Sequence, residues 1–449
     1  MALGPYVHCL QPSQNAFGRF TMLSRYRPSI YKLTEMLRAL EARPSDYALL
    51  FDLQKELLSR IKRTDARIAA LKTKRKALVQ QKKAGAKKEE AKRTKDAIAA
   101  TSEAITDAQR LLFFWRCFGD GIAFIYLNKL ALKHMLYNTH EYSVKEAAGA
   151  ILGKVGLRKE WSILKLIIGR EIPAVLSDLT NTIRHGDICV LIGPDPIPVE
   201  VKTSKNRNAR VDRQIASLTA LRQFLKTDVA KNFRGLDQVA RLEVPGSDVS
   251  HVDAMNDCIA SSRDSGFAAN SPEPGLTYLA VRSVEAASRL DQYMKPRTTV
   301  AILNEAKTEG QWMPYFPFVL SIRRKEDLYG FMNGDLTLMI LLETDELVAA
   351  FAAKGLAATF VDHPMVTLVV TRPGAIPGRA PLSGISTPYF ARLFFEFASI
   401  ASFADMELTH LTYLETHLDE LTTKFGLAHA PPDNPTLVEW PQFTPMKWP

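Results

Sequence analysis

The feature that most constrains this chain is a heptad repeat of apolar residues between positions 50 and 112. The first series is Leu50, Leu57, Leu71 and Leu78, with Ile61 and Ile68 on the complementary position and with Thr64 and Arg75 as interruptions. A glycine at position 85 follows, and then a second series, Ala91, Ile98, Ile105 and Leu112. Two heptad segments around a glycine-containing break predict an antiparallel helical hairpin.

The positive charge of the chain is concentrated in the same segment. Residues 61–95 hold 14 lysines and arginines against three acidic residues, a net charge of +11, while the other 414 residues together carry −1. The first interpretation is a solvated coiled-coil arm used for dimerisation. A second, compatible with the first, is that the tip of the hairpin contacts nucleic acid phosphates through Lys82, Lys83, Lys87 and Lys88. Contact with an anionic membrane surface is a third, which no acylation motif or Trp/Phe face supports.

Length and composition narrow the class of protein. A chain of 449 residues exceeds one compact domain, so two or three domains are expected. No uncharged apolar run approaches 18 residues and the N-terminus lacks the layout of a secretory signal, so we predict a cytoplasmic protein without a membrane span. The four cysteines lie far apart and are expected to be free thiols: Cys9, Cys117, Cys189 and Cys258.

Composition also suggests how the chain is divided. Residues 1–115 are predicted to be a helical region that carries the hairpin, and Gly119-Asp120-Gly121 a turn in which Asp120 caps the next helix. Residues 246–275 are small, polar and turn-rich, which is typical of a linker or surface insertion. Residues 276–449 are predicted to be an α/β region that serves regulation or recognition, with strands at 276–281, 298–303, 336–342 and 366–371 and a helix at 388–403.

The residues that indicate chemistry lie between positions 187 and 202. The apolar runs 188–192 and 197–202 flank a Gly-Pro turn and predict a β-hairpin, which brings Asp187 and Glu200 to the same end of two neighbouring strands. Two converging carboxylates favour a Mg²⁺ ion, with Mn²⁺ as a substitute. Lys202 projects from the same face as Glu200 and is placed to hold a water or a phosphate. Asp195 lies in the turn, too near Glu200 to reach the far end of the strand.

The sequence of elements from the helix at 158 to the helix at 210–226 resembles the PD-(D/E)xK nuclease superfamily, in particular Holliday-junction-resolvase and RecB-type nucleases. The match consists of Asp187, the Glu200-Val-Lys202 triplet 13 residues later, and the elements around them, and it covers about a sixth of the chain. The resemblance implies a restriction-endonuclease-like mixed-sheet core within residues 116–245. It also implies a helix-borne acid, Glu160 or its substitute Glu171, that orients a second metal ion or the water.

The resemblance assigns further roles after the Glu200 strand. Gln214, on the following helix, would position the lysine or the phosphate. Lys205, Arg207 and Arg210 would face a backbone phosphate of the substrate. An ExK triplet alone is a weak signal, since Glu90-Ala-Lys92 and Glu305-Ala-Lys307 fit it too.

These observations predict a Mg²⁺-dependent DNA endonuclease that forms a homo-oligomer through its coiled-coil arm. RNA as a substrate and the need for a regulatory partner protein are left open. Its architecture suits a bacterial antiphage-defence effector or a repair nuclease. The alternative is a non-enzymatic coiled-coil scaffold that binds nucleic acid or a partner protein. In that case Glu200 and Lys202 form an exposed ion pair on an edge strand, or the nuclease fold is degenerate and retained for binding.

Overall fold

The computed structural model describes residues 23–83, 88–147, 149–201, 209–241, 248–283, 288–306, 318–363, 366–375, 383–425 and 444–445. They form two compact units, which we call the hairpin unit and the C-terminal unit. The hairpin unit comprises the described residues within Phe20–Val239 and Pro317–Tyr329, and the C-terminal unit those within Ala240–Phe316 and Gly330–Pro449. The chain is mixed α/β, as predicted. No helix in the described ranges is long and apolar enough to cross a membrane.

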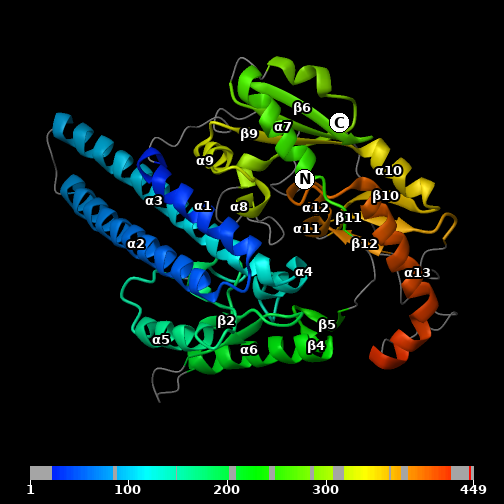
Figure 1. Ribbon diagram of the computed structural model, residues 1–449, viewed down its shortest axis with the longest axis horizontal. Coiled ribbons are helices and arrows are strands. Elements are labelled where there is room, and N and C mark those ends of the chain that lie inside the picture. The colour runs from blue at the N-terminus through cyan, green and yellow to red at the C-terminus, as the bar shows by residue number, and fades with distance from the viewer. Residues whose placement is uncertain are drawn as a thin grey trace. The chain divides into compact units, whose positions relative to one another are not determined.

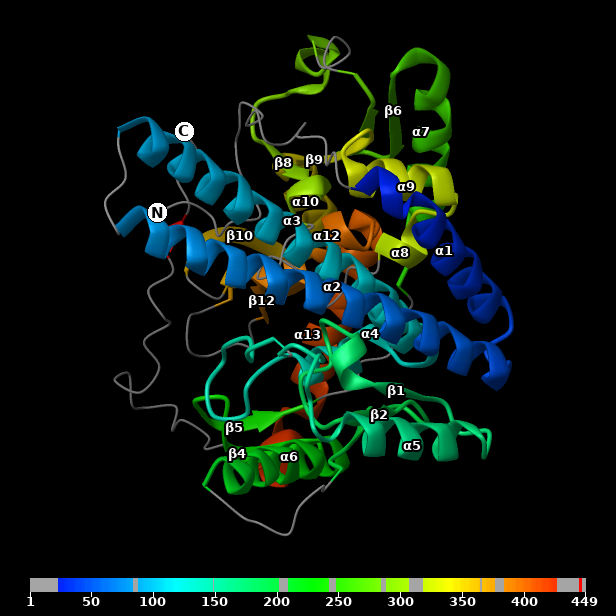
Figure 2. The same cartoon turned by 90° about the vertical axis from the view of Figure 1, so that its left-hand side faces the viewer.

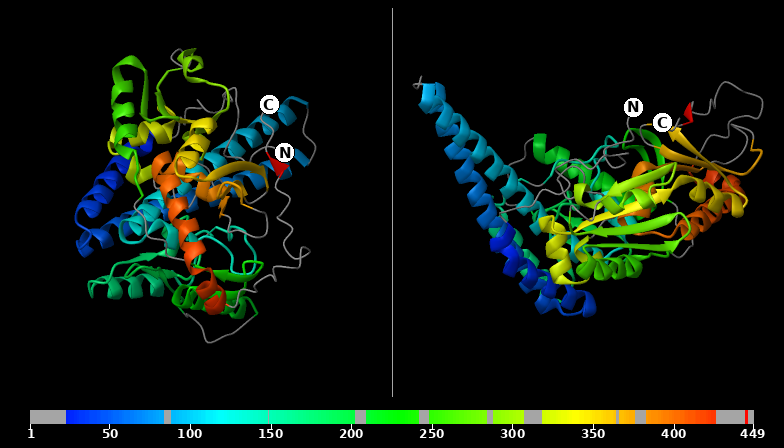
Figure 3. Two further views of the ribbon diagram at one scale, coloured as in Figure 1. Left: turned by 90° about the vertical axis from the view of Figure 1, so that its right-hand side faces the viewer. Right: turned by 90° about the horizontal axis from the view of Figure 1, so that it is seen from above.

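The predicted helical hairpin is confirmed. Helices α2 (Tyr47–Lys83) and α3 (Lys88–Tyr126) lie side by side in every view, with α1 (Arg27–Ala42) packed against them (Figures 1, 2 and 3). The heptad residues Leu50, Leu57, Ile61 and Ile68 are buried, whereas Leu71 and Leu78 are only half-buried. The hairpin therefore has an inner part, embedded in its unit, and an outer part in which each helix is covered mainly by the other.

Two polar residues of the hairpin are buried for reasons the sequence does not reveal. Thr64, which interrupts the heptad series, accepts a hydrogen bond of 3.1 Å from the indole Nε1 of Trp115 on α3. The prediction that Asp120 lies in a turn and caps the next helix is wrong. Asp120 lies inside α3 and accepts hydrogen bonds from the backbone N–H groups of Asn181 and Thr182. Gly119 is required because a Cβ there would lie 1.9 Å from the carbonyl oxygen of Leu179.

The hairpin unit also contains a small antiparallel sheet with the strand order β1-β2-β3. Its strands are β1 (Ala174–Leu176), β2 (Ile188–Val190) and β3 (Ile197–Val199), flanked by α5 (Leu157–Ile168) and α6 (Ala209–Thr227). The predicted β-hairpin is confirmed, but its strands are shorter than the apolar runs, since β2 ends at Val190 and β3 at Val199, and residue 202 lies outside the described residues. The helix predicted at 210–226 is confirmed as α6. The helix predicted from 158 is confirmed as α5, which ends at Ile168; Glu171 then adopts a positive φ of 59° and Pro173 leads into β1.

The described residues of this unit do not form the predicted mixed sheet, because β1, β2 and β3 pair in the antiparallel sense throughout. The strand that follows α6, β4 (Val229–Phe233), pairs with β5 (Leu236–Ala240) and does not extend the three-stranded sheet. The remaining elements of this unit are short: η1 (Leu23–Tyr26), α4 (Lys129–Leu132), η2 (Lys133–Met135), η3 (Ser177–Leu179) and α8 (Phe318–Ser321). Helix α9 (Lys325–Asn333) spans the boundary between the two units.

The C-terminal unit contains two four-stranded sheets, with the orders β6-β7-β9-β8 and β12-β11-β10-β13. The strands are β6 (Phe267–Glu273), β7 (Leu276–Val281), β8 (Thr298–Ile302), β9 (Thr337–Glu343), β10 (Ala357–Asp362), β11 (Val366–Thr371), β12 (Ser383–Ser386) and β13 (Thr444–Pro445). The helices are α7 (Val252–Ser265), α10 (Thr344–Ala353), α11 (Thr387–Phe390), α12 (Arg392–Phe395) and α13 (Ile400–Phe425), with η5 (Asp291–Tyr293) and η6 (Leu303–Ala306). The four strands predicted here are confirmed as β7, β8, β9 and β11.

Two predictions for this part of the chain are wrong. The supposed linker at 246–275 contains α7 and β6, and α7 buries Met255, Cys258 and Ile259 against the first sheet. The segment resembles a linker in sequence because most residues of α7 are small and polar, while its few apolar residues lie on one face of the helix. The single helix expected at 388–403 is interrupted between α12 and α13, where Phe397 has a φ of 55°.

Candidate active site

The backbone of Asp187 is fixed at one end of the three-stranded sheet. Its N–H donates to the carbonyl oxygen of Val199 at 2.8 Å, and its carbonyl oxygen accepts from the N–H of Ser177 at 2.9 Å. The hydrogen bonds of β2 to β3 and to β1 therefore begin at Asp187, one residue before β2. The preceding Gly186 has a φ of 74°, and a Cβ there would lie 3.0 Å from the backbone nitrogen and oxygen of Val199. Glycine at 186 is what lets the chain approach β3 so closely.

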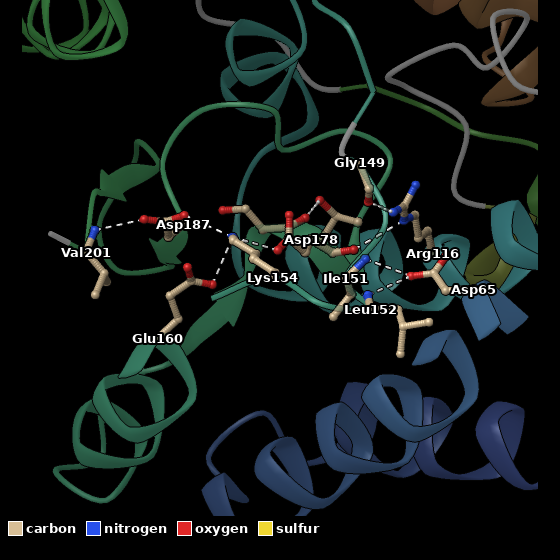
Figure 4. Close-up of polar contacts among 12 residues, drawn as sticks. Asp65, Arg116, Gly149, Ile151, Leu152, Lys154, Glu160, Asp178, Asp187 and Val201 are labelled. Carbon is tan, nitrogen blue, oxygen red and sulfur yellow. Dashed lines mark hydrogen bonds and ion pairs between the residues drawn. The ribbon is translucent and has the colours of Figure 1, made fainter. Parts of the chain in front are cut away.

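A cluster of charged side chains surrounds this point (Figure 4). The ammonium Nζ of Lys154 lies 2.9 Å from Oε2 of Glu160, 2.8 Å from Oδ2 of Asp178 and 3.1 Å from Oδ1 of Asp187. Glu160 comes from the first turn of α5, Asp178 from η3 beside the sheet, and Lys154 from the loop that precedes α5. The Glu160 side chain is 2% exposed and the Lys154 side chain 28%. We call these four residues the Lys154 cluster.

The two long helices hold the segments that supply this cluster. On α2, Asp65 accepts hydrogen bonds from the backbone N–H groups of Ile151 (2.7 Å) and Leu152 (3.3 Å). On α3, Arg116 donates to the carbonyl oxygens of Gly149 (3.0 Å) and Asp178 (3.2 Å). The inner part of the hairpin therefore anchors both the loop that carries Lys154 and the turn that carries Asp178 (Figure 4).

The electrostatics of the cluster favour a charged lysine. Burial alone would lower the pKa of Lys154, but Asp178, Glu160 and Asp187 outweigh it and raise that pKa above its usual range. The pKa of Glu160 is raised by burial and by the nearby Asp187, and the contact with Lys154 offsets only part of this. The other carboxylate oxygen of Asp187, Oδ2, accepts a hydrogen bond from the backbone N–H of Val201 at 2.9 Å.

Glu200, the second predicted metal ligand, lies one residue beyond β3 with its side chain at the surface. Partial desolvation and the neighbouring Asp187 raise the pKa of Glu200, and Lys145, Lys154 and Arg222 counteract them. The pairing of β2 with β3 thus places Asp187 and Glu200 at the same end of the two strands, as the hairpin predicted. Glu171, the alternative helix-borne acid, is exposed beyond the end of α5, whereas Glu160 reaches the cluster.

The other predicted residues are not brought to the cluster by the described part of the chain. Gln214 is exposed on α6, and Lys82 and Lys83 are exposed at the end of α2. Lys87, Lys202, Lys205 and Arg207 lie outside the described residues. Lys88 and Arg210 belong to α3 and α6, but their side chains lie outside what the structure describes.

A buried histidine next to the sheet is structural. The Nε2 atom of His185 lies 2.9 Å from the carbonyl oxygen of Tyr137, and its Nδ1 lies 3.3 Å from Nζ of Lys145. Burial, together with Lys145, lowers the pKa of His185 to about 4. The ring is therefore neutral at pH 7, and it joins the segment after α4 to the start of β2.

The acids of the cluster are chemically suited to a divalent metal ion, because carboxylate oxygens are the ligands that Mg²⁺ prefers. Among the described residues, however, no group of three or more His, Cys, Asp or Glu side chains is arranged to hold a metal ion. The place between the carboxylates is taken by the Lys154 ammonium. The residues thus fit a metal ion by type, while their present spacing fits an ammonium.

Two residues of the Lys154 cluster, Asp178 and Lys154, were not predicted as site residues from the sequence. Asp178 lies among Ser, Thr and Asn residues that predict a turn, and Lys154 lies in a loop without a motif. The partners of Lys154 are six, 24 and 33 residues away in sequence, so no local spacing marks it. The pairing of Ser177 with Asp187 across the sheet is the feature that brings Asp178 beside Asp187.

Comparisons of this chain with protein-family models, with curated proteins and with solved structures find no match. The case for a function rests on the contacts of the site itself. Those contacts join a helix-borne glutamate, an aspartate at the end of a sheet and the backbone of Val201, the residue after Glu200.

Proposed function

We propose that this chain is a Mg²⁺-dependent endonuclease that hydrolyses phosphodiester bonds in DNA. The observation that carries the proposal is the meeting of Glu160 and Asp187, from a helix and a sheet, around a single cation. Glu200 adjoins Asp187, because the N–H of the next residue, Val201, donates to the Asp187 carboxylate. Carboxylates converging in this way are the usual means of holding a metal ion at a phosphodiester.

Asp187, Glu200 and Glu160 are the residues that would hold the ion. Bound Mg²⁺ supplies a polarised phosphate oxygen and a more acidic water. Lys202, two residues after Glu200 in the chain, would stabilise the negative charge that develops on the phosphate. Gln214 would position that lysine or the phosphate, and Lys205, Arg207 and Arg210 would hold the backbone of the substrate.

Cleavage of supercoiled and linear DNA in Mg²⁺ or Mn²⁺ tests the proposal, with Lys202→Ala as the decisive variant. We expect the wild type to cut and Lys202→Ala to lose about 100-fold or more of the rate, the usual cost of removing a group that stabilises developing charge. Lys226→Ala, which removes an exposed lysine near the end of α6, is the matched control and should cut normally. Equal cutting by Lys202→Ala and wild type would remove Lys202 from the mechanism. RNA is assayed in parallel.

One observation favours a second function, binding of nucleic acid without cleavage. The outer part of the hairpin, residues 72–83 and 88–95, carries exposed basic side chains that have no ion-pair partner among the described residues: Lys72, Lys74, Arg75, Lys76, Lys82, Lys83, Lys92, Arg93 and Lys95. A row of uncompensated positive charge binds phosphates without reading sequence.

The two functions are separated by Asp187→Asn. If the chain is an endonuclease, this variant loses cleavage and retains DNA binding through the hairpin. If it is a scaffold, neither wild type nor variant cuts, and both bind DNA with the same affinity and the same dependence on salt. Replacement of Lys72, Lys74 and Lys76 by Glu should weaken binding in both cases.

A further inference from the structure

The Lys154 cluster has the contacts of a complete cation site. The Lys154 ammonium donates hydrogen bonds to Oδ2 of Asp178 (2.8 Å) and Oδ1 of Asp187 (3.1 Å), and Oε2 of Glu160 lies 2.9 Å from it as an ion-pair partner. Buried or half-buried carboxylates need a neighbouring positive charge, and Lys154 contacts all three. The acids that a metal ion would neutralise are therefore already paired with a charge from the chain itself.

Lys154 is delivered to this place by a loop whose backbone is fixed. Asp65 of α2 holds the N–H groups of Ile151 and Leu152, and Arg116 of α3 holds the carbonyl oxygen of Gly149. The side chain of Lys154 is 28% exposed and ends a flexible chain of four methylenes. Its ammonium can thus move toward solvent while the loop and the three carboxylates stay where they are.

A divalent ion and the ammonium cannot share this place. Both need the same oxygens of Glu160 and Asp187, and two cations at neighbouring positions in a partly buried site repel each other strongly. We infer that Lys154 is a built-in counter-ion of the three carboxylates, and that a divalent metal ion binds to Glu160 and Asp187 only by displacing it. The inference rests on the proposed function for the identity of the incoming ion.

The first test measures Mn²⁺ binding to the full chain by isothermal titration, without nucleic acid. Lys154→Met removes the charge and keeps the length of the side chain, and we expect it to bind Mn²⁺ at least tenfold more tightly than the wild type. Adding Asp187→Asn to this variant should abolish the gain. Lys165→Met, which removes an exposed lysine of α5, is the matched control and should bind like the wild type. Equal or weaker binding by Lys154→Met, or no binding by either protein, would overturn the inference.

A second measurement uses the wild type alone and does not depend on whether Lys154→Met folds. Acetylation of Lys154 by acetic anhydride, followed by mass spectrometry, should be slow without metal and several-fold faster with saturating Mn²⁺, while acetylation of Lys165 stays constant. Unchanged acetylation of Lys154 in Mn²⁺-bound protein would show that the ammonium is not displaced.

These outcomes are independent of cleavage. Tighter binding by Lys154→Met without DNA cutting by any variant supports the counter-ion and rejects the endonuclease. Cutting that depends on Lys202, together with Mn²⁺ binding unaffected by Lys154→Met, supports the endonuclease and rejects the counter-ion.

Discussion

Asp120 is a carboxylate inside α3 with no exposed surface. Burial raises the pKa of Asp120 to about 6, even though the backbone N–H of Thr182 and the amide of Asn181 stabilise its charged form. A folded-state pKa above the ordinary value of 3.8 means that the folded chain binds this proton more tightly than the unfolded chain. The contribution of Asp120 to stability is therefore fully present below about pH 4 and is lost as the pH rises through 6.

We expect Asp120→Asn to remove this pH dependence. Between pH 4 and 6.5 the unfolding free energy of the wild type should fall by up to about 3 kcal/mol relative to the variant, since each pKa unit is worth about 1.4 kcal/mol. Urea unfolding at a series of pH values measures it. Asp96→Asn, at an exposed position of the same helix, should run parallel to the wild type. Parallel curves for Asp120→Asn as well would mean that Asp120 titrates normally.

Thr64 and Trp115 form a buried polar contact between α2 and α3. Thr64→Val keeps the volume of the side chain but leaves the indole N–H of Trp115 without its acceptor. We expect a loss of about 1–3 kcal/mol, the usual penalty for a buried donor left unpaired. The matched control is Thr73→Val, because Thr73 makes the same hydrogen bond to the carbonyl four residues earlier but is exposed. Equal chemical denaturation midpoints for the two variants would show that the indole contact contributes nothing.

The roles of single residues were hard to predict wherever their partners are distant in sequence. Asp120 follows a glycine and precedes another, which suggests a turn, yet its partners lie 61 and 62 residues further along the chain. Lys154 is a comparable case. Asp187 and Glu200 were proposed because a β-hairpin places them by a local rule, and Glu160 because the resemblance implies an acid on the helix that precedes the hairpin.

Whole elements were predicted best where their pattern is local. The heptads predicted α2 and α3, and the apolar runs around Gly193-Pro194 predicted β2 and β3. Helix α7 and strand β6 were missed because their buried side chains are few, and their burial comes from pairing with β7, which lies beyond them in sequence. The sheet order was not predictable either, because nothing local shows that β4 pairs with β5.

The close approach of Gly186 to Val199 of β3 can be tested by substitution. Gly186 and Gly193 have nearly equal φ values, 74° and 76°, but a Cβ at 186 meets Val199 whereas one at 193 meets nothing within 4 Å. Gly193→Ala should therefore cost only the left-handed strain of about 1–2 kcal/mol. Gly186→Ala should cost about 1–3 kcal/mol more, because Val199 must move. Thermal unfolding of the two variants compares them directly, and equal losses would mean that the space at 186 is easily relaxed.

The hairpin unit is stabilised at one end of its long helices. Gln54 donates to the carbonyl oxygen of Ala174 and accepts from the N–H of Leu176 in β1, and Asp65, Arg116 and Asp120 bind neighbouring segments. All four residues lie on the inner part of α2 and α3. The outer part has exposed charges and half-buried heptad positions in their place.

This division predicts what happens when the outer part is removed. A chain in which residues 73–98 are replaced by a short Gly-rich turn should keep the circular dichroism of a folded protein and the unfolding free energy of the inner part, because every contact between α2 or α3 and the Lys154 cluster remains. The same chain should lose most of its affinity for DNA. The slope of log K against log salt should fall by about 0.9 for each phosphate that the removed lysines contacted.

The same variant also separates the two uses proposed for the hairpin. If the outer part joins two copies of the chain, sedimentation velocity should show the wild type as a dimer and the shortened chain as a monomer at the same concentration. If it serves only to bind phosphates, both chains sediment as one species and differ in DNA binding alone. Loss of the folded state on shortening would contradict both, since it would mean that the unit depends on the outer helices for its stability.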